Sequence, residues 1–228
     1  MAKLELFLLG TPQIVVDGQT ITNFNTRKDQ ALLVYLAVTG ATHSRESLAS
    51  LLWSDLPEEK ARRNLRHALS HLQKAIGSQW LTTERGVALV QAYPWSVDVH
   101  TLRVALKSMT ASSAHTAGRA IPPTIDALQQ VLQLYRGEFL QGFHLHDAVY
   151  FEEWVLAQRE ELRLLTLRGL EALVEACQVQ GAYEQGLAAT QRLLQLEPWS
   201  EPAHCLQMQL LAQSGRRTAA LDGQCNLI

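Results

Sequence analysis

The chain has 228 residues, of which 47% are hydrophobic and 18% charged, an ordinary composition for a soluble protein with a real core. No apolar run approaches the roughly 20 residues that cross a bilayer, and no signal-peptide pattern opens the chain, so we expect a cytoplasmic protein without a membrane partner. The net charge of −2 hides an asymmetry. Residues 1–110 hold 12 Lys and Arg against 9 Asp and Glu, whereas residues 111–228 hold 8 against 13. This asymmetry fits a basic nucleic-acid module joined to an acidic one.

The first 24 residues alternate in the manner of short strands. Leu4, Leu6 and Leu8 share one face, and Asp17-Gly18 is a dipeptide typical of tight turns. The pattern predicts a small antiparallel sheet at the start of the chain.

Two helical patterns follow the strands. The first covers residues 26–39 and ends at Gly40, a residue type that commonly follows the last turn of a helix. The second opens at Ser44, whose hydroxyl can cap a helix N-terminus.

The third helical pattern, residues 58–76, has two different faces at about 100° per residue. The apolar face consists of Ala61, Leu65, Ala68, Leu69, Leu72 and Ile76. The opposite face is polar and basic, with Arg63, His67, Ser70 and Lys74, and with Arg66 on its flank. Such a helix suits the major groove of DNA, where phosphates attract the charges and arginine can bind guanine. A solvated helix face that happens to be basic is the alternative.

A hairpin is expected after this third helix. We expect Asp55 to cap the helix at its start and Gly77 to end it. In the hairpin, Gly86 can supply a positive φ at the turn. The order of sheet, two helices, basic helix and hairpin is that of a winged helix, whose third helix enters the groove. Arg85 at the tip of this wing is then placed to reach a phosphate or the minor groove.

The second half of the chain is predicted to be helical after a short interruption. Residues 97–109 have a helical pattern, residues 108–123 contain few large apolar side chains and suggest a linker or surface loop, and a helix that ends near Gly137 follows. His71, four residues after His67, falls at the edge of the core, so we expect it to pack there rather than bind a metal.

Two segments near the end repeat with a shift of 34 residues, since Gly181 matches Gly215. That period is the one of tetratricopeptide units, which bury their apolar faces only by stacking. Pro198 lies where such a unit often has a proline, and its equivalent in the next unit would fall past Ile228. We therefore expect the last unit to be truncated. A generic helical bundle with a chance repeat is the alternative.

The fold class predicted from these patterns is mostly α with a small β component. We expect a response-regulator-type winged-helix DNA-binding domain at residues 1–107, a linker at 108–123, and a tetratricopeptide-like all-α repeat domain at 124–228.

These segments, taken in this order, resemble the bacterial transcriptional activators of the antibiotic-regulatory-protein type. The resemblance rests on LELFLLG, TRKDQALLVYLAVTG, SRESLASLLW and KARRNLRHALSHLQKAIG in the first half. In the second half it rests on LQLYRGEFLQGF, EEWVLAQREELRLL and EPWSEPAHCLQMQLLAQSGRRTAAL. That family joins a winged helix to a helical "bacterial transcriptional activator domain". One departure is the wing, which lacks the Gly-Tyr pair usual before its last strand and has Gly86-Val87 instead.

The resemblance implies a regulator that binds repeats in double-stranded promoter DNA and recruits RNA polymerase, with the helical half in dimerisation, polymerase contact or signal input. By position it implies that Arg62, Arg63, Arg66, His67 and Ser70 face DNA. The charges add Lys74 on the same helix, Arg85 on the wing, and Arg27, Lys28 and Arg45 near helix starts.

The sequence shows no Walker A, dinucleotide-binding, HExxH or nucleophile-elbow pattern, so we expect no enzyme, no cofactor and no metal site. His144, His146 and Asp147 are the nearest approach to a zinc site, but four residues of one loop seldom close a tetrahedron, and a polar turn is the simpler interpretation. The competing function is a tetratricopeptide-type protein scaffold whose winged helix serves protein contacts.

Overall fold

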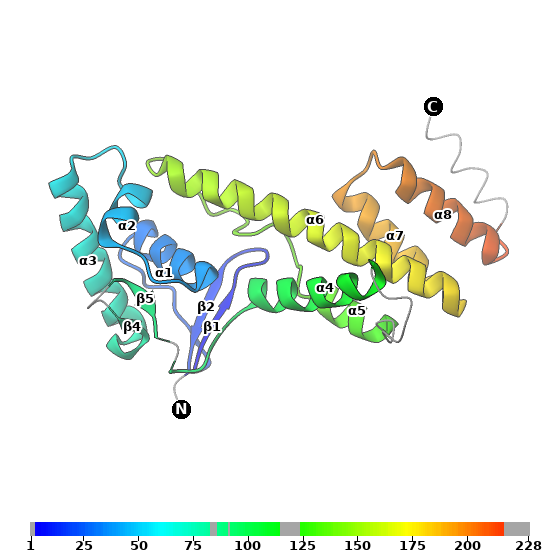
Figure 1. The fold of residues 1–228 in the computed structure, drawn as a ribbon, viewed down its shortest axis with the longest axis horizontal. Helices are drawn as coiled ribbons and strands as arrows, with labels where there is room; N and C mark the ends of the chain where they lie inside the picture. Colours follow the sequence, from blue (N-terminus) through cyan, green and yellow to red (C-terminus); the bar gives the residue numbers. More distant parts are fainter. Residues whose placement is uncertain (1–2, 83–85, 91, 115–123, 217–228) are drawn as a thin grey trace. The chain divides into compact units, whose positions relative to one another are not determined.

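The computed structural model describes residues 3–82, 86–90, 92–114 and 124–216. The chain forms two compact units. The first contains residues 1–101 together with residues 136–160, and the second contains residues 102–135 and the chain from residue 161 onward. The model confirms a mostly helical fold with a small β component, a winged helix followed by a helical domain (Figure 1).

A four-stranded sheet opens the first unit, with the order β3-β2-β1-β6. Its strands are β1 (Leu4–Phe7), β2 (Gln13–Val16), β3 (Gln19–Thr20) and β6 (Trp95–Val97). The leucines expected on one face of β1 and just after it are fully buried, and the turn at Asp17-Gly18 has positive φ at both residues, so the predicted hairpin is confirmed. Strand β6 was not expected, because its three residues follow a proline and pair in parallel with β1, far away in sequence.

Helix α1 (Arg27–Thr39) occupies the predicted range, and α2 (Arg45–Leu52) begins where the sequence predicts. Thr26 caps α1 and Gly40 ends it with a left-handed backbone, φ 61°. Ser44 caps α2 by accepting the Ser47 N–H at 3.0 Å.

Helix α3 (Glu58–Ile76) packs most closely against α1 and α2. Every residue of the predicted apolar face is buried, which confirms the division of the helix into two faces. Gly77 ends it with φ 99°. The expected cap by Asp55 is wrong: Pro57 occupies the N-cap position and no side chain caps the helix. Asp55 lies two residues before the cap, too far along the chain for the side-chain bond that an N-cap residue makes to the first turn.

The wing consists of β4 (Leu81–Thr82) and β5 (Ala88–Leu89), after the short 3₁₀ helix η1 (Ser78–Trp80). Gly86 has φ 147°, and a Cβ there would lie 2.5 Å from the Thr42 methyl, so only glycine fits. The next residue, Val87, exchanges two backbone hydrogen bonds with His43, of 2.9 and 2.8 Å. The hairpin is therefore tied to the loop between α1 and α2. The expected wing-tip residue, Arg85, lies outside the described residues.

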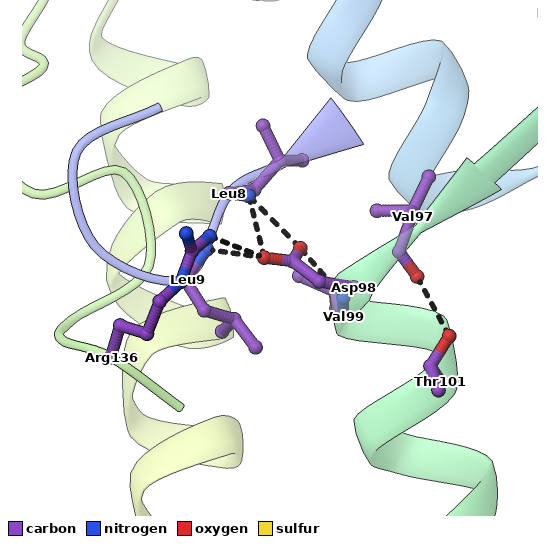
Figure 2. A network of polar contacts seen from close by, with 7 residues as sticks. All are labelled: Leu8, Leu9, Val97, Asp98, Val99, Thr101 and Arg136. Atoms are coloured by element: carbon purple, nitrogen blue, oxygen red, sulfur yellow. Dashed lines mark hydrogen bonds and ion pairs between the residues drawn. The ribbon is translucent and has the colours of Figure 1, made fainter. Parts of the chain in front are cut away.

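A buried carboxylate joins three parts of the first unit (Figure 2). Asp98, the first residue of helix α4 (Asp98–Ala114), accepts the backbone N–H groups of Leu8, Leu9 and Val99 at 2.9 to 3.1 Å. The Arg136 guanidinium lies 3.4 Å away. Burial raises the pKa of Asp98, while the three N–H donors and Arg136 act in the opposite direction.

The second unit consists of helices and contains most of α4, α5 (Ile125–Leu132), the later part of α6 (Val149–Gln180), α7 (Tyr183–Leu196) and α8 (Glu201–Gln213). Helix α4 continues to Ala114, into the stretch expected to be a linker; residues 115–123 lie outside the described part of the chain. The helix expected to end near Gly137 ends at Leu132 instead. The carbonyls of Leu132 and Tyr135 both accept hydrogen bonds from Arg192 on α7.

The 34-residue repeat is visible in the backbone. After α6, Gly181 has φ 69°, and the Ala182 N–H donates to the Cys177 carbonyl at 2.9 Å. After α8, Gly215 has φ 84°, and the Arg216 N–H donates to Leu211, also at 2.9 Å. Both are Schellman ends, displaced by the predicted period. Helices α7 and α8 between them lie side by side (Figure 1). The same shift also matches Gly186 with Ala220 and Leu187 with Leu221 in the sequence, and the second member of each pair lies outside the described residues.

The expected domain boundaries at residues 107 and 124 stay a prediction. Residues 136–160, beyond the expected linker, belong to the first compact unit. In the part of the chain that the structure describes, no helix is long and apolar enough to span a membrane.

Candidate nucleic-acid interface

The outer face of α3 consists of polar side chains that the solvent reaches. Because the helix has 19 residues, it is about 28 Å long at 1.5 Å per residue. The residues expected to face DNA are all exposed: Arg62, Arg63, Arg66, His67, Ser70 and Lys74. The structure therefore brings the predicted helix residues together on one surface.

The arginines on this surface differ in their partners. Arg62 bridges two carboxylates, 2.8 Å from Glu46 on α2 and 2.5 Å from Glu58 one turn earlier on α3. Arg63 and Arg66 pair with no acidic side chain among the described residues. These two guanidinium groups keep all their donors available, whereas Arg62 shares its donors with two neighbours.

Helix α3 is held against α1 by a polar contact in addition to its apolar face. Asp29, 1% exposed, accepts the Thr26 N–H at 3.0 Å in the capping box of α1, and its Oδ2 lies 3.2 Å from Nδ1 of His71 on α3. His71 is partly buried, which confirms that it packs at the edge of the core. This role of Asp29 was not expected, although Thr-x-x-Asp before an apolar run is the spacing of a capping box.

The two cations at the start of α1 are engaged by the segment that precedes α6. Lys28 is 11% exposed; its ammonium lies 2.8 Å from the Asp147 carboxylate and 5.5 Å from the centre of the Trp53 ring. The hydrogen bond from Lys28 lowers the pKa of Asp147. Arg27 is exposed and donates one long hydrogen bond, 3.4 Å, to the His144 carbonyl. Lys28 is therefore already engaged within the first unit.

Of the other expected contacts, Arg45 is exposed at the first position of α2. The zinc arrangement considered for His144, His146 and Asp147 is not seen as a cluster: within the described ranges, no three His, Cys, Asp or Glu side chains are grouped as metal ligands. Instead, Asp147 is paired with Lys28, and Nδ1 of His144 lies 3.5 Å from Glu152.

Residues 97–223 match the model of the bacterial transcriptional activator domain, which is more than half of the chain. The chain belongs to this family. It is a transcriptional regulator of the antibiotic-regulatory-protein type, and the predicted family resemblance is confirmed. A search of curated proteins found no match.

Among solved structures, the regulator is similar to Mycobacterium tuberculosis EmbR, described in complex with a low-affinity phosphopeptide. The two agree with a TM-score of 0.70 at 21% sequence identity. The match covers 100% of this chain and 59% of the EmbR chain, so the regulator spans about three fifths of EmbR's length. At this identity the similarity concerns the fold.

Proposed function

We propose that the regulator binds double-stranded promoter DNA sequence-specifically, with α3 in the major groove. The observation that supports this most directly is the outer face of α3. It presents Arg63 and Arg66 without acidic partners, while the whole apolar face of the same helix is buried. A helix of this kind fits the major groove, and two free guanidinium groups can bind guanine edges or phosphates.

The wing and the loop after α1 support the same arrangement. The bridge between His43 and Val87 fixes the hairpin to the helical core, as a winged helix needs if wing and third helix are to meet one duplex. The proposal also includes binding to repeats in the promoter and recruitment of RNA polymerase by the helical half. Family membership supports these two parts, rather than a contact in this structure.

The test is a fluorescence-anisotropy titration of the full chain against a library of genomic fragments, followed by the selected site at several salt concentrations. We expect Arg63→Ala to cost about 1–3 kcal/mol and to relax specificity at one base pair if Arg63 binds a base. Arg168→Ala, an exposed helical arginine of the second unit, is the matched control and should change nothing. Equal, weak and sequence-independent binding by wild type and Arg63→Ala would favour the scaffold function instead.

For polymerase recruitment, the measurement is in vitro transcription from the selected promoter with purified RNA polymerase. The full chain should raise the transcript level on the natural site and not on a site with scrambled repeats. An unchanged transcript level on the natural site would contradict activation.

A further inference from the structure

An open cleft of about 600 Å³ lies beside α3 within the first unit. Four parts of the chain line it: the start of α1, the segment between α2 and α3, the flank of α3 next to its outer face, and residues 144–147 before α6. Trp53, Leu56 and Leu145 supply its apolar lining. The cleft is therefore contiguous with the proposed DNA surface, since His67 belongs to both.

Several charged groups of this cleft already have partners within it. Lys28 is paired with Asp147 at 2.8 Å, and Asp29 is held by the α1 capping box and by His71. These contacts leave the cleft walls polar and fixed in position. They do not supply the free donors that an outside ligand needs.

Three cationic or potentially cationic side chains remain for a ligand. Arg27, His67 and His146 are exposed and line the cleft; among them, His146 interacts electrostatically with Asp147, which Lys28 already engages. Arg27 makes one long bond to a carbonyl and keeps its other N–H groups. Guanidinium and imidazole groups together are donors that suit an oxyanion, and the guanidinium fork matches phosphate geometry.

We propose that this cleft binds a phosphate group through Arg27, His67 and His146. Asp55 also lines the cleft, and its carboxylate has no partner in the part of the chain that the structure describes, so it opposes the bound anion. The phosphate has two sources with the same chemistry. It belongs either to the DNA backbone beside α3, which rests on the proposed function, or to a free phosphorylated small molecule.

The first experiment uses no DNA and therefore tests the cleft whether or not the chain binds a promoter. The isotope-labelled full chain is titrated with inorganic phosphate at about pH 6.5, near the ordinary histidine pKa, at constant ionic strength and with histidine resonances observed by NMR. We expect saturable shifts at His67 and His146, and about five-fold weaker binding in His146→Ala, which loses one charge-assisted contact. Asp55→Asn should bind phosphate more tightly than wild type.

The second experiment measures DNA affinity of His146→Ala across a salt series in phosphate-free buffer. His146 is not on α3, so its loss does not disturb the groove contacts. If the backbone supplies the phosphate, affinity falls for all sequences alike, and the slope of log K against log salt becomes shallower by about 0.9. If a free molecule supplies it, DNA affinity stays unchanged while inorganic phosphate still binds.

The control in both experiments is Arg168→Ala, which should match wild type. The proposal is overturned if phosphate produces no saturable shift and His146→Ala binds DNA like wild type. If the chain binds phosphate normally but does not bind DNA, the proposed function is contradicted. The cleft assignment then stays intact, with a free molecule as the source of the phosphate.

Discussion

Arg66 on α3 and Lys28 on α1 are both cations of the basic half of the chain, and they have opposite surroundings. Arg66 is exposed and has no acidic partner among the described residues, whereas Lys28 is nearly buried between Asp147 and the Trp53 ring. The Arg66 charge is available to a partner, whereas the Lys28 charge contributes to the packing of the first unit. The number of cations in a segment therefore does not tell how many can contact DNA, and each must be judged by its neighbours.

The largest effect should come from the buried carboxylate that accepts three backbone N–H groups. Asp98→Ala leaves three backbone N–H groups without their acceptor, so we expect the free energy of unfolding to fall by about 3 kcal/mol, even though a buried charge is also removed. Urea denaturation measures this. The exposed Glu153→Ala should stay within about 0.5 kcal/mol of wild type. Equal stability of the two variants would show that Asp98 does not hold the sheet to α4.

Arg66→Ala tests the outward-facing charge. We expect DNA binding to weaken by about 1–2 kcal/mol, because an unpaired guanidinium is lost from the outer face of α3. The free energy of unfolding should change by less than about 0.5 kcal/mol, because nothing buried is removed. Anisotropy and urea denaturation on the same preparation separate the two quantities. A variant that loses stability but not affinity would reverse the role assigned to Arg66.

Lys28→Ala should lower stability more than DNA affinity, the opposite of Arg66→Ala, and its main effect should be smaller than that of Arg66→Ala. The loss of the ion pair and of the stem packed on Trp53 should lower stability by about 1 kcal/mol. DNA affinity should fall less than in Arg66→Ala, since the Lys28 side chain is nearly buried and already paired with Asp147. An affinity loss equal to that of Arg66→Ala would place Lys28 among the DNA contacts after all.

The smallest effect concerns His43, which anchors the wing. Burial lowers the pKa of His43, so the unfolded chain binds its proton more readily. Stability contributed by this group is therefore lost as the pH falls through the unfolded histidine pKa of about 6.5. Thermal unfolding between neutral and mildly acidic pH should depend less on pH in His43→Gln than in wild type. An identical pH dependence would mean that His43 titrates as it does in the unfolded chain.

The sequence predicted what depends on neighbours along the chain. The apolar face of α3, the cap at Ser44 and the positive φ of Gly86 all follow from local spacing, and all are confirmed. Strand β6 and the early end of α5 were missed, because a parallel partner and an arginine from another helix decide them.

In the candidate site too, local features could be predicted from the sequence and long-range contacts could not. Exposure of the outer face of α3 could be predicted from helical period alone. The engagement of Lys28 by Asp147 could not, because 119 residues separate the two partners. The expected cap by Asp55 was wrong. The spacing of Asp55 and Glu58 resembles a capping box, but Pro57 occupies the N-cap position and α3 begins at Glu58.

The matched endings at Gly181 and Gly215 have a consequence for how such a chain can change length. Each helix end is formed by one glycine and by carbonyls of the last turn of the preceding helix. It therefore requires no contact from distant parts of the molecule. A whole 34-residue repeat can then be added or removed while the turns between helices stay the same. An insertion of any other length would need a different turn.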